Sequence, residues 1–251
     1  MLARWLDCGL PPHLVHVSDP SGREVAPGVA TSTALPERVA PGTLVLLGFK
    51  PQQFADVAPQ IDARLAPGCA IVSMLAGLPL PLLKGRLPSA ATIVRIMPNL
   101  PVRTGDGTVL MHALAGGAPE MLATINRLLA PLGLVEPLVD EGDFDLATAV
   151  SGCGPAYVYR FVDALAGAAV RLGMGQDQAL RLALQTVAGA GTSALNAAQS
   201  PAAMADAVAS PGGMTRLGLD VLDADERLLN LLTDTLRAAR DRGAELAAGA
   251  A

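Results

Sequence analysis

Apolar residues in the first part of the chain fall into short continuous runs separated by amphipathic stretches. The run GTLVLLGF, residues 42–49, is apolar throughout, which is typical of a strand buried on both faces of a parallel sheet. The stretch after it carries apolar residues at helical spacing from Phe54 to Leu65 and predicts an amphipathic helix. Strands are likewise expected at 68–75, 91–99, 108–114 and 133–139, and helices at 78–87 and 119–133. This alternation predicts an α/β fold with a doubly wound sheet.

Near Glu141 the pattern changes from alternating strands and helices to helices alone. The apolar residues that follow recur with the helical period, and no strand signal is found. Ser200 is expected to be the N-cap of a helix in which Pro201 is the first residue. Gly173 is expected to end an earlier helix. Helices are expected at 154–173, 176–195, 200–209, 214–223 and 224–246. The sequence therefore predicts two domains, an α/β domain of residues 1–142 and an all-α domain of residues 143–251.

The expected helices are rich in alanine and leucine, and their apolar faces need a partner. Alanine and glycine in AGAAVRLG (166–173) and VAGAGTSAL (187–195) allow helix backbones to approach closely. Packing within one chain explains this pattern. Burial against a second subunit explains it equally, because an all-α domain of this composition has little polar surface to spare.

The first residues of the chain predict a short helix followed by a short strand. Apolar residues from Met1 to Leu6 have helical spacing, Gly9 is placed as a helix stop, and the run from Leu14 to Val17 predicts the strand. Asp19 then stands at the strand tip. Helix, strand and acid have the order of the second half of a dinucleotide-binding βαβ unit. The first strand of that unit and its glycine-rich turn do not occur in the sequence.

The residues at this strand tip suit two coenzymes. Asp19, with Pro20 beside it, is placed to accept a hydrogen bond from a ribose 2′-hydroxyl, as in NADH. Ser18, Ser21 and Arg23 suit the 2′-phosphate of NADPH. A nicotinamide coenzyme is therefore expected, and both forms fit.

Charge and cysteine content exclude several classes of protein. The 251 residues carry a formal net charge of −5, which argues against a nucleic-acid partner. The three cysteines are odd in number and scattered, so neither a disulfide framework nor a zinc site is expected, and a reducing compartment fits. No uncharged apolar run is long enough to span a bilayer, and the N-terminus lacks a secretory layout. The composition predicts a cytoplasmic protein with no metal, membrane or nucleic-acid ligand.

The distribution of lysine and histidine limits the chemistry of the expected all-α domain. Both lysines (Lys50 and Lys84) and all three histidines precede residue 143. A ketone reductase needs a proton donor for the developing alkoxide, whereas an imine that is protonated before hydride transfer needs little acid catalysis. The sequence therefore favours an imine substrate whose charged group is held by backbone N–H and hydroxyl groups.

A candidate for such a site is SPGGMT, residues 210–215, between two expected helices. Its two glycines permit positive φ and expose consecutive N–H groups, and the start of the next helix adds its dipole, which together form an anion-binding nest. A plain turn between helices explains the same residues. Lys50 and Asn99 each follow an expected strand, at the carboxyl edge of the sheet where ligands bind in such folds.

Five segments of the chain occur in the order found in one family of reductases. They are Lys50-Pro51, Ala76-Gly77, the stretch RIMPN that ends at Asn99, the stretch SGCGPAY from Ser151 to Tyr157, and the stretch SPGGMT from Ser210 to Thr215. In these segments the chain resembles pyrroline-5-carboxylate reductase, and the resemblance extends from Met1 to about Leu246. The family begins with a strand and a glycine-rich turn, about 15–20 residues, that this sequence lacks.

The resemblance implies reduction of the cyclic imine 1-pyrroline-5-carboxylate to L-proline with NADPH or NADH, the last step of proline biosynthesis. It implies a Rossmann-like domain followed by an all-α domain that forms a homodimer, which in some members assembles into larger homo-oligomers. It also implies roles for single residues. Those bordering the coenzyme are Lys50, Pro51, Ala76, Gly77 and Asn99, in addition to Asp19 and Pro20. Those holding the substrate are Ser210, Pro211, Gly212, Gly213 and Thr215, with the Thr215 hydroxyl facing the ring nitrogen as the catalytic group.

Two other interpretations of the sequence stay open. Another two-domain NAD(P)-dependent imine or keto reductase would share this fold, and a basic side chain entering the substrate site would support it. A catalytically impaired or dead truncated paralogue that still dimerises would explain the missing glycine-rich turn.

Overall fold

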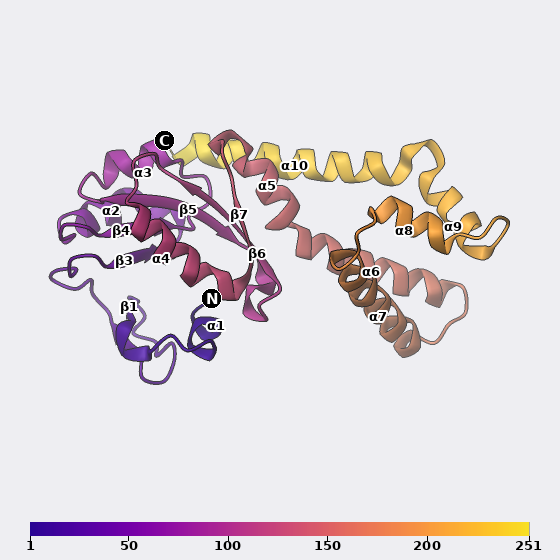
Figure 1. The fold of residues 1–251 in the computed structure, drawn as a ribbon, viewed down its shortest axis with the longest axis horizontal. Helices are drawn as coiled ribbons and strands as arrows, with labels where there is room; N and C mark the ends of the chain where they lie inside the picture. Colours follow the sequence, from indigo (N-terminus) through magenta and orange to yellow (C-terminus); the bar gives the residue numbers. More distant parts are fainter. Residues whose placement is uncertain (251) are drawn as a thin grey trace. The chain divides into compact units, whose positions relative to one another are not determined.

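The computed structural model describes residues 1–250, with side chains placed as far as residue 246. These residues form two compact units, shown in Figure 1. The first, called here the α/β unit, comprises Met1–Cys153 together with the residues from Ala238 onward. The second, called here the helical unit, comprises Gly154–Arg237.

Five strands form the main sheet of the α/β unit. In spatial order they are β3 (Leu44–Leu47), β4 (Ala70–Ser73), β5 (Thr92–Pro98), β6 (Gly107–Ala113) and β7 (Gly133–Pro137). Strands β3, β4 and β5 are parallel, β6 is antiparallel to β5, and β7 is parallel to β6. The direction reverses at β6 because the connection after β5 is short, whereas a parallel return needs a crossover of a dozen or more residues. The predicted α/β fold class, a Rossmann-like sheet followed by helices, is confirmed.

Helices pack on both faces of this sheet, because successive residues of a buried strand point to opposite sides. The helices of the unit before residue 153 are α1 (Leu2–Asp7), α2 (Phe54–Asp62), α3 (Leu80–Arg86), α4 (Pro119–Leu129) and α5 (Phe144–Ser151). On one face Ile71 and Ile93 pack with apolar residues of α2 and α3. On the other face Val72 and Val94 pack with Trp5 of α1 and with residues of α4. Helix α5 is not among the predicted helices, since its 8 residues are too few to display a helical period.

A second, smaller sheet lies at the N-terminus of the α/β unit. Strand β1 (His16–Ser18) pairs in parallel with β2 (Ala30–Ser32). The strand begins later than predicted because Pro12 opens a 3₁₀ turn over Pro12–Leu14. In the part of the chain that the structure describes, β1 pairs only with β2, and β3 pairs only with β4.

Both β1 and β3 therefore have one open edge. These are the two strands that would flank the first strand of a complete dinucleotide-binding unit. Three of the four residues of β3 are partly exposed, whereas β4 is buried along its whole length. Strand β3 is apolar enough for a central strand but occupies an edge of the sheet.

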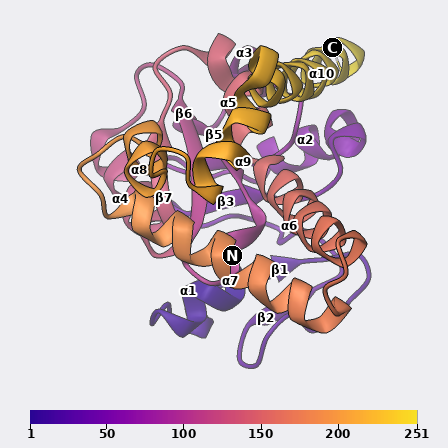
Figure 2. The ribbon, with the colours of Figure 1, turned by 90° about the vertical axis from the view of Figure 1, so that its right-hand side faces the viewer.

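The helical unit consists of helices joined by short turns (Figure 2). They are α6 (Gly154–Arg171), α7 (Gln176–Leu195), α8 (Pro201–Val208), α9 (Met214–Asp223) and the first part of α10 (Arg227–Ala250). Ser200 is the predicted N-cap of α8, and its hydroxyl accepts a hydrogen bond from the Ala203 N–H at 3.2 Å. Helices α6 and α7 pack through small residues, among which Ala166, Ala179 and Ala183 are buried.

Two further observations concern the whole described chain. None of the helices in residues 1–250 is both long enough and apolar enough to cross a membrane. All three cysteines are free thiols, with Cys8 exposed, Cys153 partly exposed and Cys69 buried.

Candidate active site

The carboxyl ends of three neighbouring strands bring predicted coenzyme residues to one edge of the main sheet. Lys50 and Pro51 follow β3, Ala76 and Gly77 follow β4, and Asn99 follows β5. Because these strands are parallel and adjacent, their carboxyl ends lie side by side. This is the edge at which open α/β sheets bind ligands.

Lys50 supplies an uncommitted positive charge at this edge. Its side chain is exposed, and its ammonium group makes no hydrogen bond or ion pair within the described residues. Its backbone is fixed by the 3₁₀ turn Pro51–Gln53, since the Lys50 N–H donates to Gln53 Oε1 at 3.3 Å and the Gln53 N–H donates to Lys50 O at 2.9 Å. A phosphate group is the kind of ligand that such a free ammonium group attracts.

The turn after β4 requires a glycine. Gly77 is buried and has a φ of 74°, which a residue with a side chain rarely adopts. Ala76 beside it is exposed, so a small residue lies at the surface of the turn. The chain then passes through Pro79 into α3. This turn presents backbone to a ligand with little side-chain obstruction.

Among the predicted coenzyme residues at this edge, Asn99 has the side chain that makes hydrogen bonds to two other segments of the protein. Its Oδ1 accepts a hydrogen bond from the Thr108 N–H at 2.9 Å, and its Nδ2 donates to the carbonyl oxygen of Ser151 at 3.0 Å. The first bond ties it to β6. The second joins the RIMPN stretch to the first residue of the SGCGPAY stretch, at the end of α5.

The backbone here is also close-packed. A Cβ atom on Gly152 would lie 2.9 Å from the carbonyl oxygen of Thr148. Glycine at this position thus permits the tight end of α5.

Asp19 and Pro20 follow β1 in the smaller sheet. The Asp19 Oδ1 accepts a hydrogen bond from the Ser21 N–H at 2.9 Å, which makes a short turn. Hydrogen bonding from Ser21 lowers the pKa of the Asp19 carboxyl group below its ordinary value. The Asp19 side chain is therefore an ionised carboxylate at neutral pH, which can accept hydrogen bonds.

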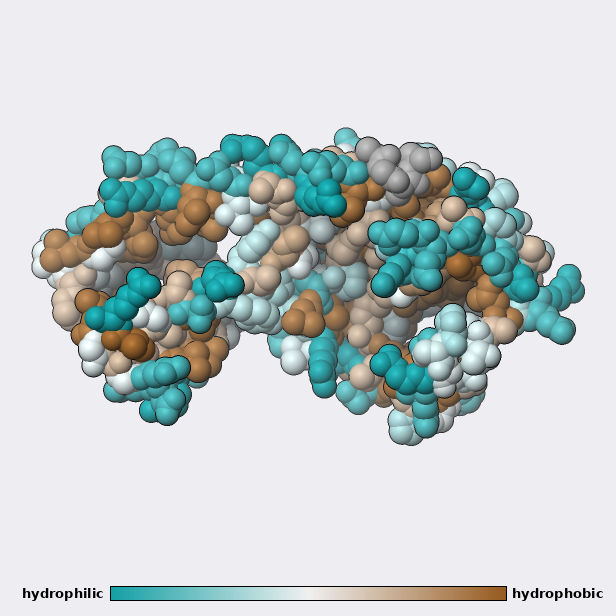
Figure 3. All heavy atoms as spheres, turned by 180° about the vertical axis from the view of Figure 1, so that it is seen from behind, coloured by the Kyte–Doolittle hydropathy of each residue, from teal (hydrophilic) through white to brown (hydrophobic). Residues whose placement is uncertain are grey.

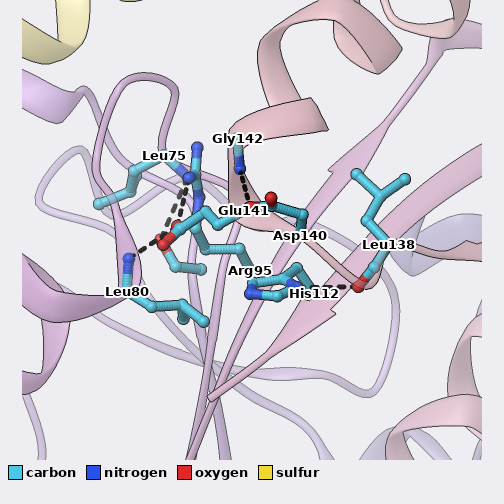
Figure 4. A network of polar contacts seen from close by, with 9 residues as sticks. Leu75, Leu80, Arg95, His112, Leu138, Asp140, Glu141 and Gly142 are labelled. Carbon is cyan, nitrogen blue, oxygen red and sulfur yellow. Dashed lines mark hydrogen bonds and ion pairs between the residues drawn. The ribbon is translucent and has the colours of Figure 1, made fainter. Parts of the chain in front are cut away.

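A cavity of about 270 Å³ adjoins the Gly77 turn, and sequence reasoning assigned no role to most of its lining. It is lined by Gly77, Pro79, Arg95, Glu141, Gly142 and Asp145. Arg95 lies in the middle of β5, is 5% exposed, and donates from Nη1 to Glu141 Oε1 at 2.5 Å. Figure 4 shows the two side chains pointing toward each other. The Arg95 guanidinium also lies over the Phe144 ring, 4.0 Å from the centroid.

A signal for Arg95 was present in the sequence, because it is a charged residue inside an otherwise apolar buried strand. Its register partner on β6 is His112, whose Nδ1 lies 2.8 Å from the carbonyl oxygen of Leu138. Glu141 carried no comparable signal, since acidic residues are common in exposed connections. No group of three or more potential metal ligands occurs among the described residues.

The predicted substrate residues lie in the helical unit, in the turn between α8 and α9. Gly212 has a φ of 71°, and the Gly213 N–H donates to Ser210 O at 2.9 Å, so the loop forms a tight turn. Gly213 is the N-cap of α9 and provides no side-chain cap. The backbone N–H groups of the first turn of α9, which include that of Thr215, are therefore available to an anion. Ser210, Pro211, Gly212 and Thr215 are exposed.

Arg216, the residue after Thr215, fastens the two sides of this loop. It donates to Asp220 Oδ1 within α9 at 2.8 Å and to Asp206 Oδ1 on α8 at 3.2 Å. A third bond, of 3.3 Å, reaches Asp223. The hydrogen bond with Asp220 is the main reason that the pKa of Arg216 is raised above its ordinary value. The ends of the Ser210–Thr215 loop are thereby tied together.

Comparison with known proteins identifies a family. Residues 141–246 match the family described as pyrroline-5-carboxylate reductase dimerisation. The chain is 35% identical over 246 residues to pyrroline-5-carboxylate reductase of Pseudomonas aeruginosa, a match that covers 95% of this chain and 89% of that protein. It is 34% identical over 218 residues to pyrroline-5-carboxylate reductase 3 of Danio rerio, covering 85% of this chain and 75% of that protein.

Solved structures give the same result. Pyrroline-5-carboxylate reductase from Coxiella burnetii superposes with a TM-score of 0.79 at 32% identity, covering 87% of this chain and 81% of that chain. Pyrroline carboxylate reductase of Plasmodium falciparum, solved with NADP bound, superposes with a TM-score of 0.82 and covers 98% of this chain and 92% of that chain. At 23% identity this second match shows the fold alone.

Proposed function

The chain belongs to the pyrroline-5-carboxylate reductase family, and from this premise we propose that it reduces 1-pyrroline-5-carboxylate to L-proline with NADPH or NADH. The observation that carries the proposal is the Ser210–Thr215 loop, which presents an uncapped helix N-terminus and a threonine hydroxyl together. The substrate offers the two complementary groups, a carboxylate and a ring nitrogen. The reaction is the last step of proline biosynthesis.

The coenzyme fits the carboxyl edge of the main sheet. The unpaired ammonium group of Lys50 attracts a phosphate group, and the buried positive-φ Gly77 lets backbone approach a ligand closely. Pro51, Ala76 and Asn99 complete the border of this region. Asp19 and Pro20, at the tip of β1, would lie near the adenosine ribose. When bound, the coenzyme supplies a hydride.

The substrate loop has two tasks in this proposal. The N–H groups of the first turn of α9 bind the carboxylate, with Ser210, Pro211, Gly212 and Gly213 shaping the turn. The Thr215 hydroxyl hydrogen-bonds the ring nitrogen and orients the C=N carbon for reduction. The imine nitrogen carries a proton before reduction, so no lysine or histidine is required, and residues 143–251 contain neither.

The direct test is spectroscopic. Purified protein is mixed with 1-pyrroline-5-carboxylate and either NADPH or NADH, and absorbance at the wavelength of the reduced coenzyme is followed while proline is quantified. We expect coenzyme oxidation matched by L-proline formation. Oxidation with a 2-keto acid but not with the imine would overturn the proposal.

A binding measurement tests the coenzyme part of the proposal separately from the reaction. NADPH is titrated into the protein, and binding is followed by coenzyme fluorescence. Saturable binding is expected, and its absence would count against a coenzyme site at the carboxyl edge of the main sheet.

We also propose a homodimer formed through the helical unit. Residues 141–246 match a dimerisation family. Large apolar side chains of α10 are exposed, among them Leu229 at 60% and Leu231 at 64%. Figure 3 shows brown apolar patches on the surface of the helical unit, on the left of that view. Burial of these patches against a second copy would remove them from water, and larger homo-oligomers could be built from such dimers.

The proposal also assigns separate roles to two domains and a location in the cell. The coenzyme residues belong to a functional domain of residues 1–142. The substrate and dimerisation residues belong to a functional domain of residues 143–251. The proposed location is the cytoplasm, where the exposed free thiol of Cys8 stays reduced. Cell fractionation with an antibody against the chain tests the location.

A further inference from the structure

Glu141 joins three segments that are distant in the sequence. Its Oε1 accepts one hydrogen bond from Arg95 Nη1 of β5 at 2.5 Å and another from the Leu80 N–H at 2.8 Å (Figure 4). Glu141 itself lies just before α5, in the turn Glu141–Asp143. One carboxylate oxygen therefore links β5, the start of α3 and the start of α5.

The bond to Leu80 acts on the turn after β4. Leu80 is the first residue of α3, and no side chain from its own neighbourhood caps that helix. The first N–H groups of a helix lack partners within the helix, so Glu141 acts as a cap supplied from 61 residues away. The segment between β4 and Leu80 includes the Ala76–Gly77 turn. Glu141 thus fixes the far end of that turn.

The bond to Arg95 fixes Glu141 in turn. Arg95 is 5% exposed, and its guanidinium contacts both the Glu141 carboxylate and the Phe144 ring. A buried guanidinium has few alternative conformations that keep its N–H groups hydrogen-bonded, because a buried donor without an acceptor is unfavourable. Arg95 lies on β5, and Asn99 directly follows this strand and holds the other end of α5 through the carbonyl oxygen of Ser151.

We propose that Glu141 is a positioning residue for the coenzyme site. Its hydrogen bonds with Arg95 and with the Leu80 N–H hold the Ala76–Gly77 turn in a fixed position relative to β5. The turn is thereby preorganised for coenzyme binding. The inference rests on the proposed function in one respect, that the coenzyme binds at this turn. It assigns no chemical step to Glu141.

The test compares two substitutions at Glu141. In Glu141→Ala both hydrogen bonds are lost. In Glu141→Gln the side-chain oxygen still accepts from the Leu80 N–H and from Arg95, and only the charge is removed. Asp143→Ala and Asp143→Asn are matched controls, because Asp143 is an exposed acid in the same turn whose side chain makes no hydrogen bond or ion pair within the described residues.

Two readouts are used. The first is amide hydrogen exchange of Leu80, followed by NMR in the coenzyme-free protein. The second is the dissociation constant of NADPH, from coenzyme fluorescence, together with the KM of the imine. We expect Glu141→Ala to speed exchange of Leu80 at least ~10-fold and to weaken NADPH ~10-fold, since small displacements of binding groups have effects of this size or larger. The KM of the imine should change less than about two-fold. Glu141→Gln should retain most of the protection of the Leu80 amide and most of the NADPH affinity.

The outcomes separate this inference from the proposed function. If the unmodified protein binds NADPH but does not reduce the imine, the proposed function fails, and the exchange and binding measurements still test Glu141. Glu141→Ala with unchanged NADPH affinity overturns the inference. So does a Glu141→Gln variant as weak as Glu141→Ala, because charge and not positioning would then matter. If Glu141→Ala does not fold, Glu141→Gln and Arg95→Lys decide by the same two readouts, with unchanged Leu80 exchange and unchanged NADPH binding in Arg95→Lys counting against it.

Discussion

In the α/β unit Ile71, Leu83 and Ile93 are at most 1% exposed, whereas in the helical unit Leu172, Leu195 and Met214 are 89–92% exposed. The difference follows from architecture. A sheet has two apolar faces, and helices packed on each of them bury large side chains. The helical unit buries chiefly alanines between α6 and α7, and alanine removes little apolar area from water.

This contrast teaches that the two units obtain stability in different ways. The α/β unit completes two apolar clusters within one chain. The helical unit has a buried cluster of four small or medium side chains, namely Val162, Ala166, Ala179 and Ala183. Its remaining apolar faces need another surface, which the proposed homodimer supplies. The predictions below test the contrast, from the largest expected effect to the smallest.

Replacement of an exposed leucine of α10 should abolish the dimer. In Leu231→Asp a charge would be buried at the proposed interface, which costs about 4 kcal/mol and raises the dimer dissociation constant ~10³-fold. Light scattering coupled to size exclusion measures the mass. Leu14→Asp is the control in the α/β unit, because Leu14 is 69% exposed and Leu231 is 64% exposed. An unchanged mass for Leu231→Asp would show that the helical unit is not an interface.

Substitutions at the two proposed sites should separate catalysis from coenzyme binding. We expect Thr215→Ala to lower kcat ~100-fold, a loss typical of a removed hydrogen bond to the reacting group, with NADPH affinity unchanged. Lys50→Ala should raise the KM of NADPH ~10-fold with kcat little changed. Thr215→Ser keeps the hydroxyl and should stay active. A weaker NADPH affinity in Thr215→Ala would contradict the division between the units.

Core truncation should have different concentration dependence in the two units. Ile93→Ala removes a side chain that is 1% exposed and should lower the free energy of unfolding by about 3 kcal/mol at any protein concentration. In Leu229→Ala the decrease in the free energy of unfolding should vary with protein concentration. The reason is that Leu229 is 60% exposed within one chain and would be buried only in the dimer. Urea denaturation at several protein concentrations measures both. Equal concentration dependence in the two variants would refute this account.

The smallest effect is expected at the turn into α10. Asp225 and Glu226 have φ values of 55° and 53°, a left-handed conformation that disfavours residues with a Cβ atom. Asp225→Gly should raise the free energy of unfolding by about 0.5–1 kcal/mol. Ala224→Gly is the matched control, because Ala224 has a φ of −52° and gains nothing from glycine. Thermal unfolding measures both, and a loss of stability in Asp225→Gly would count against the strain.

Much of the fold was predictable, because the spacing of apolar residues and the residues that begin and end helices are local features of the sequence. The helix expected at 176–195 is observed as Gln176–Leu195, and that at 214–223 as Met214–Asp223. Strand β2 was not predicted, since Ala30–Ser32 is too short to show a pattern. The strand expected at 108–114 is observed as β6, Gly107–Ala113, but its antiparallel direction was not predicted, because strand direction depends on how the connection closes.

Some features of the candidate site could likewise be predicted from the sequence, and others could not. Motifs placed Lys50, Gly77, Asn99 and the Ser210–Thr215 loop as site residues, and their roles in the reaction stay predictions. The sequence alone determined the order of strands and helices, the change to helices after Glu141, and the resemblance that the relatives confirm. Only the tertiary structure decided that Glu141 accepts from both Arg95 and Leu80, and that Asn99 is tied to Ser151. Periodicity and motifs are properties of neighbouring residues, whereas a hydrogen bond across 46 or 61 positions depends on how the whole sheet and its helices pack.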